Sequence, residues 1–99
     1  MELPASFVDA DGAVVVNFGI LTGREATIAE VDRLARSVWQ AGGKRISIVA
    51  NRMHEYDGGS ETIVHQVLAR SDVIDTEQLE RLCTLWVHDC AGDRHVVPL

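Results

Sequence analysis

The chain is poor in the residues that mark several large classes of protein. Lys44 is the only lysine beside eight arginines, and fifteen acidic residues outweigh these nine basic ones, which gives a formal net charge of -6. Binding to nucleic acid depends largely on clustered Lys and Arg side chains that release counterions from phosphates. The composition therefore argues against a nucleic-acid partner.

Long apolar runs and cysteine pairs are also missing. No stretch approaches the length of a membrane-spanning helix, and the N-terminus lacks the basic start and apolar core of a signal peptide. Cys83 and Cys90 are the only cysteines and form no C-x-x-C pair, so we expect reduced thiols. These absences predict a cytoplasmic protein with no membrane partner.

What is present is the composition of one folded domain. The chain has 99 residues, 46% of them hydrophobic, and no Pro-rich or Ser-rich segment that would divide it. We therefore expect a single compact domain over residues 1–99. A chain this short buries only a modest fraction of its surface, and this favours a homo-oligomer that covers more apolar area.

The first half of the chain predicts a strand, a helix and a second strand. Residues 13–18 contain a β-branched run that suits a buried strand. Thr27 and Glu30 have the spacing of a capping box at the start of an amphipathic helix, and Gly42-Gly43 ends it. Residues 45–50 then alternate with period two. This order predicts a βαβ unit whose two strands run parallel, paired directly or with one strand between them.

The flanking segments predict hairpins and further helices. Residues 6–9 and the following Asp11-Gly12 turn indicate an N-terminal hairpin. Gly58-Gly59 indicates a turn, after which the apolar stripe from Ile63 to Leu68 predicts a second helix that ends near Arg70. We interpret Trp39 and Trp86 as core side chains.

The C-terminal segment fits two structures. Apolar residues from Leu79 to Cys90 recur at helical spacing and would extend a third helix to Gly92. Residues 84–97 also resemble a hairpin of two strands around an Ala-Gly-Asp turn, and the sequence slightly favours this hairpin. In either case we predict an α+β fold, a two-layer sandwich in which a mixed sheet carries the βαβ unit, flanking hairpins and two to three helices on one face.

Polar residues gather where the two parallel strands would end. If residues 19–26 and 51–59 leave the carboxyl ends of these strands, they meet at one sheet edge, where α/β proteins commonly bind ligands. Solvated loops at strand ends are polar too, and this is the competing explanation. The candidate ligand-binding residues at this edge are Thr22, Arg24, Arg52 and Tyr56.

Catalytic motifs are incomplete at this edge. His54 and Glu55 are the residue types for proton transfer and are the candidate catalytic pair if the protein is an enzyme. Gly58 replaces the second histidine of a zinc-protease motif, and no P-loop or nucleophile elbow is present. We therefore expect no metal and no cofactor.

Two functions are consistent with these features. The first is a small non-enzymatic protein-binding or regulatory domain that uses its acidic surface and an exposed sheet edge, either with another protein or by self-association. The alternative is a domain that binds a small anion, or a cofactor-free isomerase or lyase. In it, Arg24 and Arg52 would hold the anion while His54 and Glu55 transfer a proton.

Overall fold

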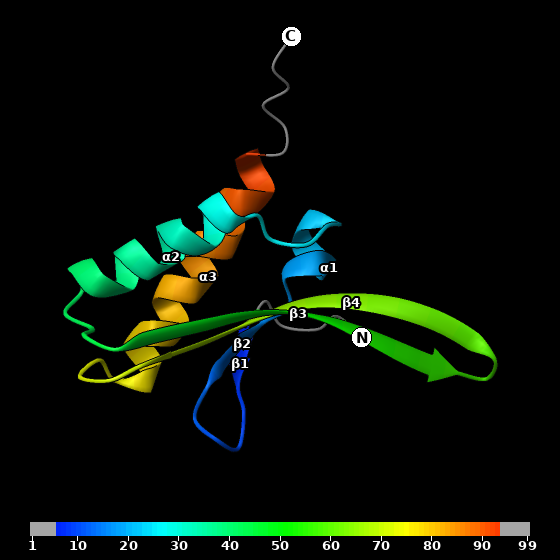
Figure 1. The fold of residues 1–99 in the computed structure, drawn as a ribbon, viewed down its shortest axis with the longest axis horizontal. Coiled ribbons are helices and arrows are strands. Elements are labelled where there is room, and N and C mark those ends of the chain that lie inside the picture. The colour runs from blue at the N-terminus through cyan, green and yellow to red at the C-terminus, as the bar shows by residue number, and fades with distance from the viewer. Residues whose placement is uncertain (1–5, 94–99) are drawn as a thin grey trace, which may run out of the picture.

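The computed structural model describes residues 6–93 as a four-stranded antiparallel sheet with three helices on one face (Figure 1). The elements are β1 (Ser6–Val8), β2 (Val14–Val16), α1 (Phe18–Thr22), α2 (Ile28–Gln40), β3 (Ile46–Asp57), β4 (Ser60–Ser71) and α3 (Thr76–Asp93). The strand order is β1-β2-β4-β3, and every neighbouring pair is antiparallel. The predicted α+β fold is confirmed, whereas the predicted mixed sheet is wrong, because no two neighbouring strands within residues 6–93 are parallel.

The first half of the chain forms a split β-α-β unit. β2 and β3 run parallel because each is antiparallel to β4, which lies between them. The predicted capping box is present: the Thr27 hydroxyl accepts from the backbone N–H of Glu30, and the Glu30 carboxylate accepts from the N–H of Thr27. The N-terminal hairpin is also confirmed, with Ser6 opposite Val16 and Val8 opposite Val14.

The predicted second helix is wrong, because Ser60–Ser71 is strand β4. Gly58 and Gly59 both have positive φ, as in the two-residue turns that join antiparallel strands. The turn sets Asp57 opposite Ser60, the first of twelve uninterrupted residue pairs between β3 and β4. Ile63, Val64, Val67 and Leu68 fit helical spacing, but their β-branched members also suit a strand, and pairing with β3 selects the strand.

The favoured C-terminal hairpin is also wrong, and the helical alternative is correct. α3 is continuous from Thr76 to Asp93, and Asp75 accepts a hydrogen bond from the backbone N–H of Gln78 at its start. Residues 94–97 of the expected hairpin lie outside the described residues. The apolar spacing of α3 prevails because it buries Cys83, Val87 and their neighbours in the core, which a strand there would leave half exposed.

The core lies between the sheet and the helices. Val14, Val16, Val67 and Ala69 line the inner face of the sheet and are buried against the helices. The core side chains contributed by the helices are Phe18, Leu34, Val38, Leu79, Cys83, Trp86, Val87 and Cys90. Trp86 is buried as expected, whereas Trp39 is 69% exposed and is not a core anchor. Within residues 6–93, no helix combines the length and apolar character needed to cross a bilayer.

One part of the sheet extends away from this core. β3 and β4 are twelve residues each, and the outer half of their hairpin projects beyond the helices and beyond β1 and β2 (Figure 1). We call residues 53–64 the arm. Its side chains are exposed from 53 to 63.

Candidate functional site

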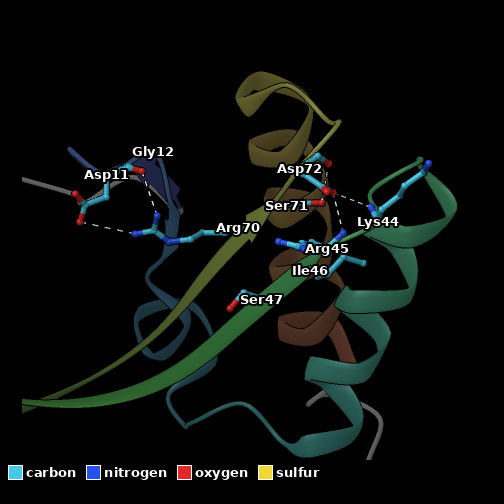
Figure 2. A pocket seen from close by; sticks show the side chains of 9 residues that line it. All are labelled: Asp11, Gly12, Lys44, Arg45, Ile46, Ser47, Arg70, Ser71 and Asp72. Carbon is cyan, nitrogen blue, oxygen red and sulfur yellow. Dashed lines mark hydrogen bonds and ion pairs between the residues drawn. The ribbon is translucent and has the colours of Figure 1, made fainter.

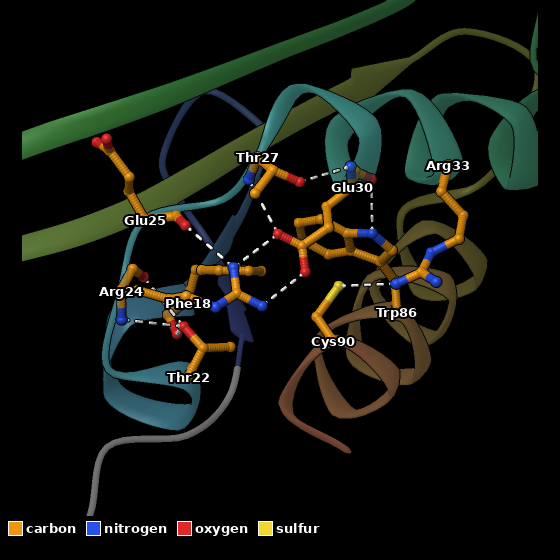
Figure 3. Close-up of polar contacts among 9 residues, drawn as sticks. All are labelled: Phe18, Thr22, Arg24, Glu25, Thr27, Glu30, Arg33, Trp86 and Cys90. Atoms are coloured by element: carbon orange, nitrogen blue, oxygen red, sulfur yellow. Dashed lines mark hydrogen bonds and ion pairs between the residues drawn. The ribbon is translucent and has the colours of Figure 1, made fainter. Parts of the chain in front are cut away.

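Thr22 and Arg24 of the predicted ligand site are engaged within the protein (Figure 3). The Thr22 hydroxyl is buried and donates to the carbonyl of Phe18 at 2.8 Å, in the short helix α1 that the sequence had suggested was a loop. Arg24 donates from both terminal nitrogens to the Glu30 carboxylate, at 2.7 and 2.8 Å, and lies over the Phe18 ring. Arg24 therefore joins α1 to the start of α2, while Thr22 stabilises the end of α1.

The carboxylate of Glu30 completes this junction. The Arg24 guanidinium beside it, together with the Thr27 N–H, lowers the pKa of Glu30 to about 2 despite the opposing effect of burial. The carbonyl of Glu30 accepts from the indole N–H of Trp86 at 2.8 Å. Cys90 accepts from Arg33 in the same region, and burial raises the pKa of its thiol to about 11. These contacts connect α2 to the α1–α2 segment and to α3. The raised pKa keeps the Cys90 thiol protonated at neutral pH.

Arg52 and His65 meet the acidic side chain of Glu25 at the base of the arm. Arg52 donates to Glu25 at 3.3 Å, and His65 Nδ1 lies 3.9 Å from the same carboxylate oxygen. His65 also packs against Gly19, where a Cβ would lie 3.1 Å from the His65 Cβ. No sequence pattern pointed directly to this group, because His65 reaches Glu25 only if residues 60–71 form a strand.

The side chains of His54 and Glu55 do not converge on one site. They are adjacent on β3, so their side chains point to opposite faces of the sheet. His54 instead lies 3.7 Å from Glu61 on the paired strand. The Glu61 carboxylate also accepts a hydrogen bond from Tyr56, which raises the pKa of the Tyr56 hydroxyl. Within residues 6–93, no three His, Cys, Asp or Glu side chains are placed to hold a metal ion together.

A second polar region lies at the opposite end of β3, at the root of the hairpin (Figure 2). An open depression of about 740 Å³ is lined there by Lys44, Arg45 and Arg70 and by Asp11 and Asp72. Asp72 accepts from the backbone N–H groups of Arg45 and Lys44, at 2.7 and 3.0 Å, and these bonds lower its pKa. Three cationic side chains against two carboxylates leave a small excess of positive charge around the start of β3.

The outer edge of β3 is the largest unpartnered backbone surface on the sheet. β3 is the last strand in the sheet order, and no strand within residues 6–93 lies beyond it. β1, at the other edge, has three residues in the part of the chain that the structure describes. Proteins commonly protect an edge with a short strand, a bulge or a covering element, but the register of β3 is unbroken over all twelve residues.

Alternate residues of β3 present their backbone groups to solvent. The Arg45 carbonyl accepts from the N–H of Asp72, so the odd-numbered residues that follow face β4. The even-numbered residues, from Ile46 to Tyr56, therefore point their N–H and C=O groups outward.

The chain matches no protein-family model, and no curated protein or solved structure shows significant similarity to it.

Proposed function

We propose that the chain is a small non-enzymatic protein-binding or regulatory domain that recognises an extended strand along the outer edge of β3. The observation that carries this proposal is the unbroken twelve-residue edge with its projecting arm. Strand addition satisfies such an edge by main-chain hydrogen bonds, while alternate side chains provide specificity. The exposed side chains beside these bonds include Val49, Met53 and Tyr56.

The arm supports the same proposal. A two-stranded hairpin without further strands or a covering helix is marginally stable in water. Residues 53–63 are exposed on both faces, yet they keep regular pairing to the Gly58-Gly59 turn. A strand bound along β3 would add a third strand to the arm and stabilise it.

The test is photocrosslinking of the full chain in cells. A benzophenone side chain at Met53 should yield adducts, whereas the same group at Glu77, which is exposed on α3, should not. Ala50→Pro should abolish the Met53 adducts, because proline removes an N–H that faces outward and leaves the bonds to β4. Circular dichroism should show that this variant remains folded. Equal labelling from both positions, or none from Met53, would overturn the proposal.

A second candidate function is binding of a small anion beside His65. The Nδ1 atom of His65 is buried and has no hydrogen-bond partner among residues 6–93, and a cavity of about 230 Å³ lies next to it, lined by Gly19, Gly23 and residues 62–65. The side chains of Arg52 and His65 both lie beside the Glu25 carboxylate. An NMR titration with inorganic phosphate tests this candidate: saturable shifts centred on His65 and Arg52 are expected, and unchanged spectra would remove it.

A further inference from the structure

We infer that the strand bound by β3 is β3 of a second copy of this chain, paired antiparallel about Asn51 to form a two-fold dimer with one continuous eight-stranded sheet. This inference rests on the proposed function and names its partner. Three features of β3 support this inference. Its charged residues and its apolar residues would each face suitable partners in the second copy, and the helices cover one half of the strand and leave the other half bare.

Charge complementarity comes first. Lys44 and Arg45 immediately precede β3, and the other end of the strand carries Glu55 and Asp57. Antiparallel pairing about Asn51 sets Arg45 of each copy opposite Asp57 of the other. Between Arg45 and Asp57 the strand has two arginines and two carboxylates, so its formal charge is zero although the whole chain carries -6. The strands can therefore pair without the repulsion that the acidic molecule as a whole would predict.

The apolar side chains match in the same register. Val49 falls opposite Met53 of the second copy, and Ile46 falls opposite Tyr56. On the sheet face away from the helices, Phe7, Val15, Leu68 and Val49 already form one row across the four strands of each copy. The pairing extends this row into Met53 and Val64 of the second copy, since Met53 and Val64 are paired within the arm.

Neighbouring registers fit less well. Because opposite residues in an antiparallel pair share a face, a two-fold register can change only in steps that keep odd residues opposite odd ones. A centre at Arg52 would place the two Arg52 side chains directly opposite each other, and Val49 opposite Glu55. A centre at Ala50 would place Arg52 opposite Ile48 and separate Val49 from Met53. Only the centre at Asn51 gives both the ion pairs and the apolar pairs.

The pairing also accounts for the projecting arm. α2 packs against β3, whereas residues 53–57 have no helix above them (Figure 1). The two-fold axis at Asn51 brings the helix-covered half of one strand beside the bare half of the other, and both helix layers lie on the same side of the joined sheet. The second copy thus supplies the strand and the helix layer that the arm lacks.

The experiment is the molar mass of the purified full chain by light scattering over a range of concentrations. We expect twice the monomer mass of 10.9 kDa at high concentration. Arg45→Asp and Asp57→Arg should each raise the dissociation constant about tenfold or more, because each places like charges opposite one another twice. The double variant should restore most of the affinity. A monomer at every concentration would overturn the inference, although Met53 adducts to another protein would still support the proposed function.

Disulfide formation tests the register. The backbone groups of Asn51 face β4, so Asn51 and its symmetry mate form a non-hydrogen-bonded pair with closely spaced Cα atoms, which suits a disulfide. Asn51→Cys should form a covalent dimer under mild oxidation, and the matched Met53→Cys should not, since Met53 faces Val49. Cys83 and Cys90 are buried and free. A dimer that crosslinks equally through both positions, or fails the charge reversal, would overturn the register.

Discussion

Glu30 connects three parts of the structure, which are the Arg24 side chain, the start of α2 and Trp86 on α3. It accepts two bonds from Arg24 and one from the N–H of Thr27, and its own side chain is only 11% exposed. Its backbone carbonyl meanwhile anchors Trp86, whose ring lies 5.2 Å from that of Phe18. The α1–α2 connection and α3 are thus held to the same residue.

The low pKa of Glu30 predicts a pH-dependent contribution to stability. The pKa of about 2 in the folded state lies below the ordinary value of 4.5, so the contribution is complete above pH 4.5 and disappears as the pH falls towards 2. Glu30→Gln should lower the free energy of unfolding at pH 7 by about 1–2 kcal/mol. The loss is modest because solvent reaches the partly exposed Arg24 side chain and screens the ion pair. Urea titrations at several pH values should show this deficit shrinking below pH 4.

The matched control is Asp32→Asn. Asp32 pairs with Arg36 one helical turn away, but both side chains are more than half exposed. Its replacement should change stability by less than about 0.5 kcal/mol at neutral pH. If the Glu30→Gln deficit were as large at pH 3 as at pH 7, the ion pair would not be its source.

At the scale of elements, Gly43 sets how closely the end of α2 approaches the end of β4. A Cβ at this position would lie 2.9 Å from Val38 Cγ1 and 3.1 Å from Ile74 Cδ1, and it would also clash with the Ser71 hydroxyl. The chain passes here from helix to strand in a fully buried position. The absent side chain is therefore required by packing.

Gly43→Ala should reduce the free energy of unfolding by about 1–3 kcal/mol, because the added methyl group forces neighbouring core atoms apart. Gly92→Ala is the control. Gly92 lies in the last turn of α3, where a Cβ would meet nothing within 4 Å in the described part of the chain, and alanine there should be neutral or slightly stabilising. Equal losses in the two variants by urea denaturation would contradict the packing explanation.

The elements also differ in how far the sequence could predict them. α2 could be predicted because Thr27, Glu30 and Gly43 carry local signals for its start and end. β4 could not, because Ile63, Val64, Val67 and Leu68 satisfy helical and strand periodicity alike, and only pairing with β3 distinguishes the two. That one error also hid part of the candidate site, since His65 reaches Glu25 from a strand and not from the predicted helix.

The predicted ligand residues show the same limit. Arg24 follows the end of α1, in the connecting segment where the sequence placed it, whereas Arg52 lies within β3 and not in a loop; their partners are Glu30 and Glu25. The spacing of charged residues along a sequence can predict that they lie in one region of the fold. It does not predict which oppositely charged side chains they pair with. The projecting arm escaped prediction because residues 51–57 continue β3 instead of forming a loop.

At the scale of the whole molecule, the helices and the arm divide the sheet into a covered half and a bare half. The covered half contains the core residues of β2 and β4, and the bare half contains residues 53–64. Two copies related by the axis at Asn51 would each cover the bare half of the other. Stability of the arm should then depend on protein concentration, while stability of the core should not.

Amide hydrogen exchange separates these two contributions along β3. The odd-numbered amides, such as Val49 and Met53, donate to β4 within one copy, so their protection should change little on dilution. The even-numbered amides Ile48, Ala50 and His54 face outward and should be protected only in the dimer. NMR-detected exchange above and below the assembly midpoint should therefore show protection that alternates residue by residue and fades on dilution. Uniform protection at all concentrations, or none at the even positions, would contradict pairing through this edge.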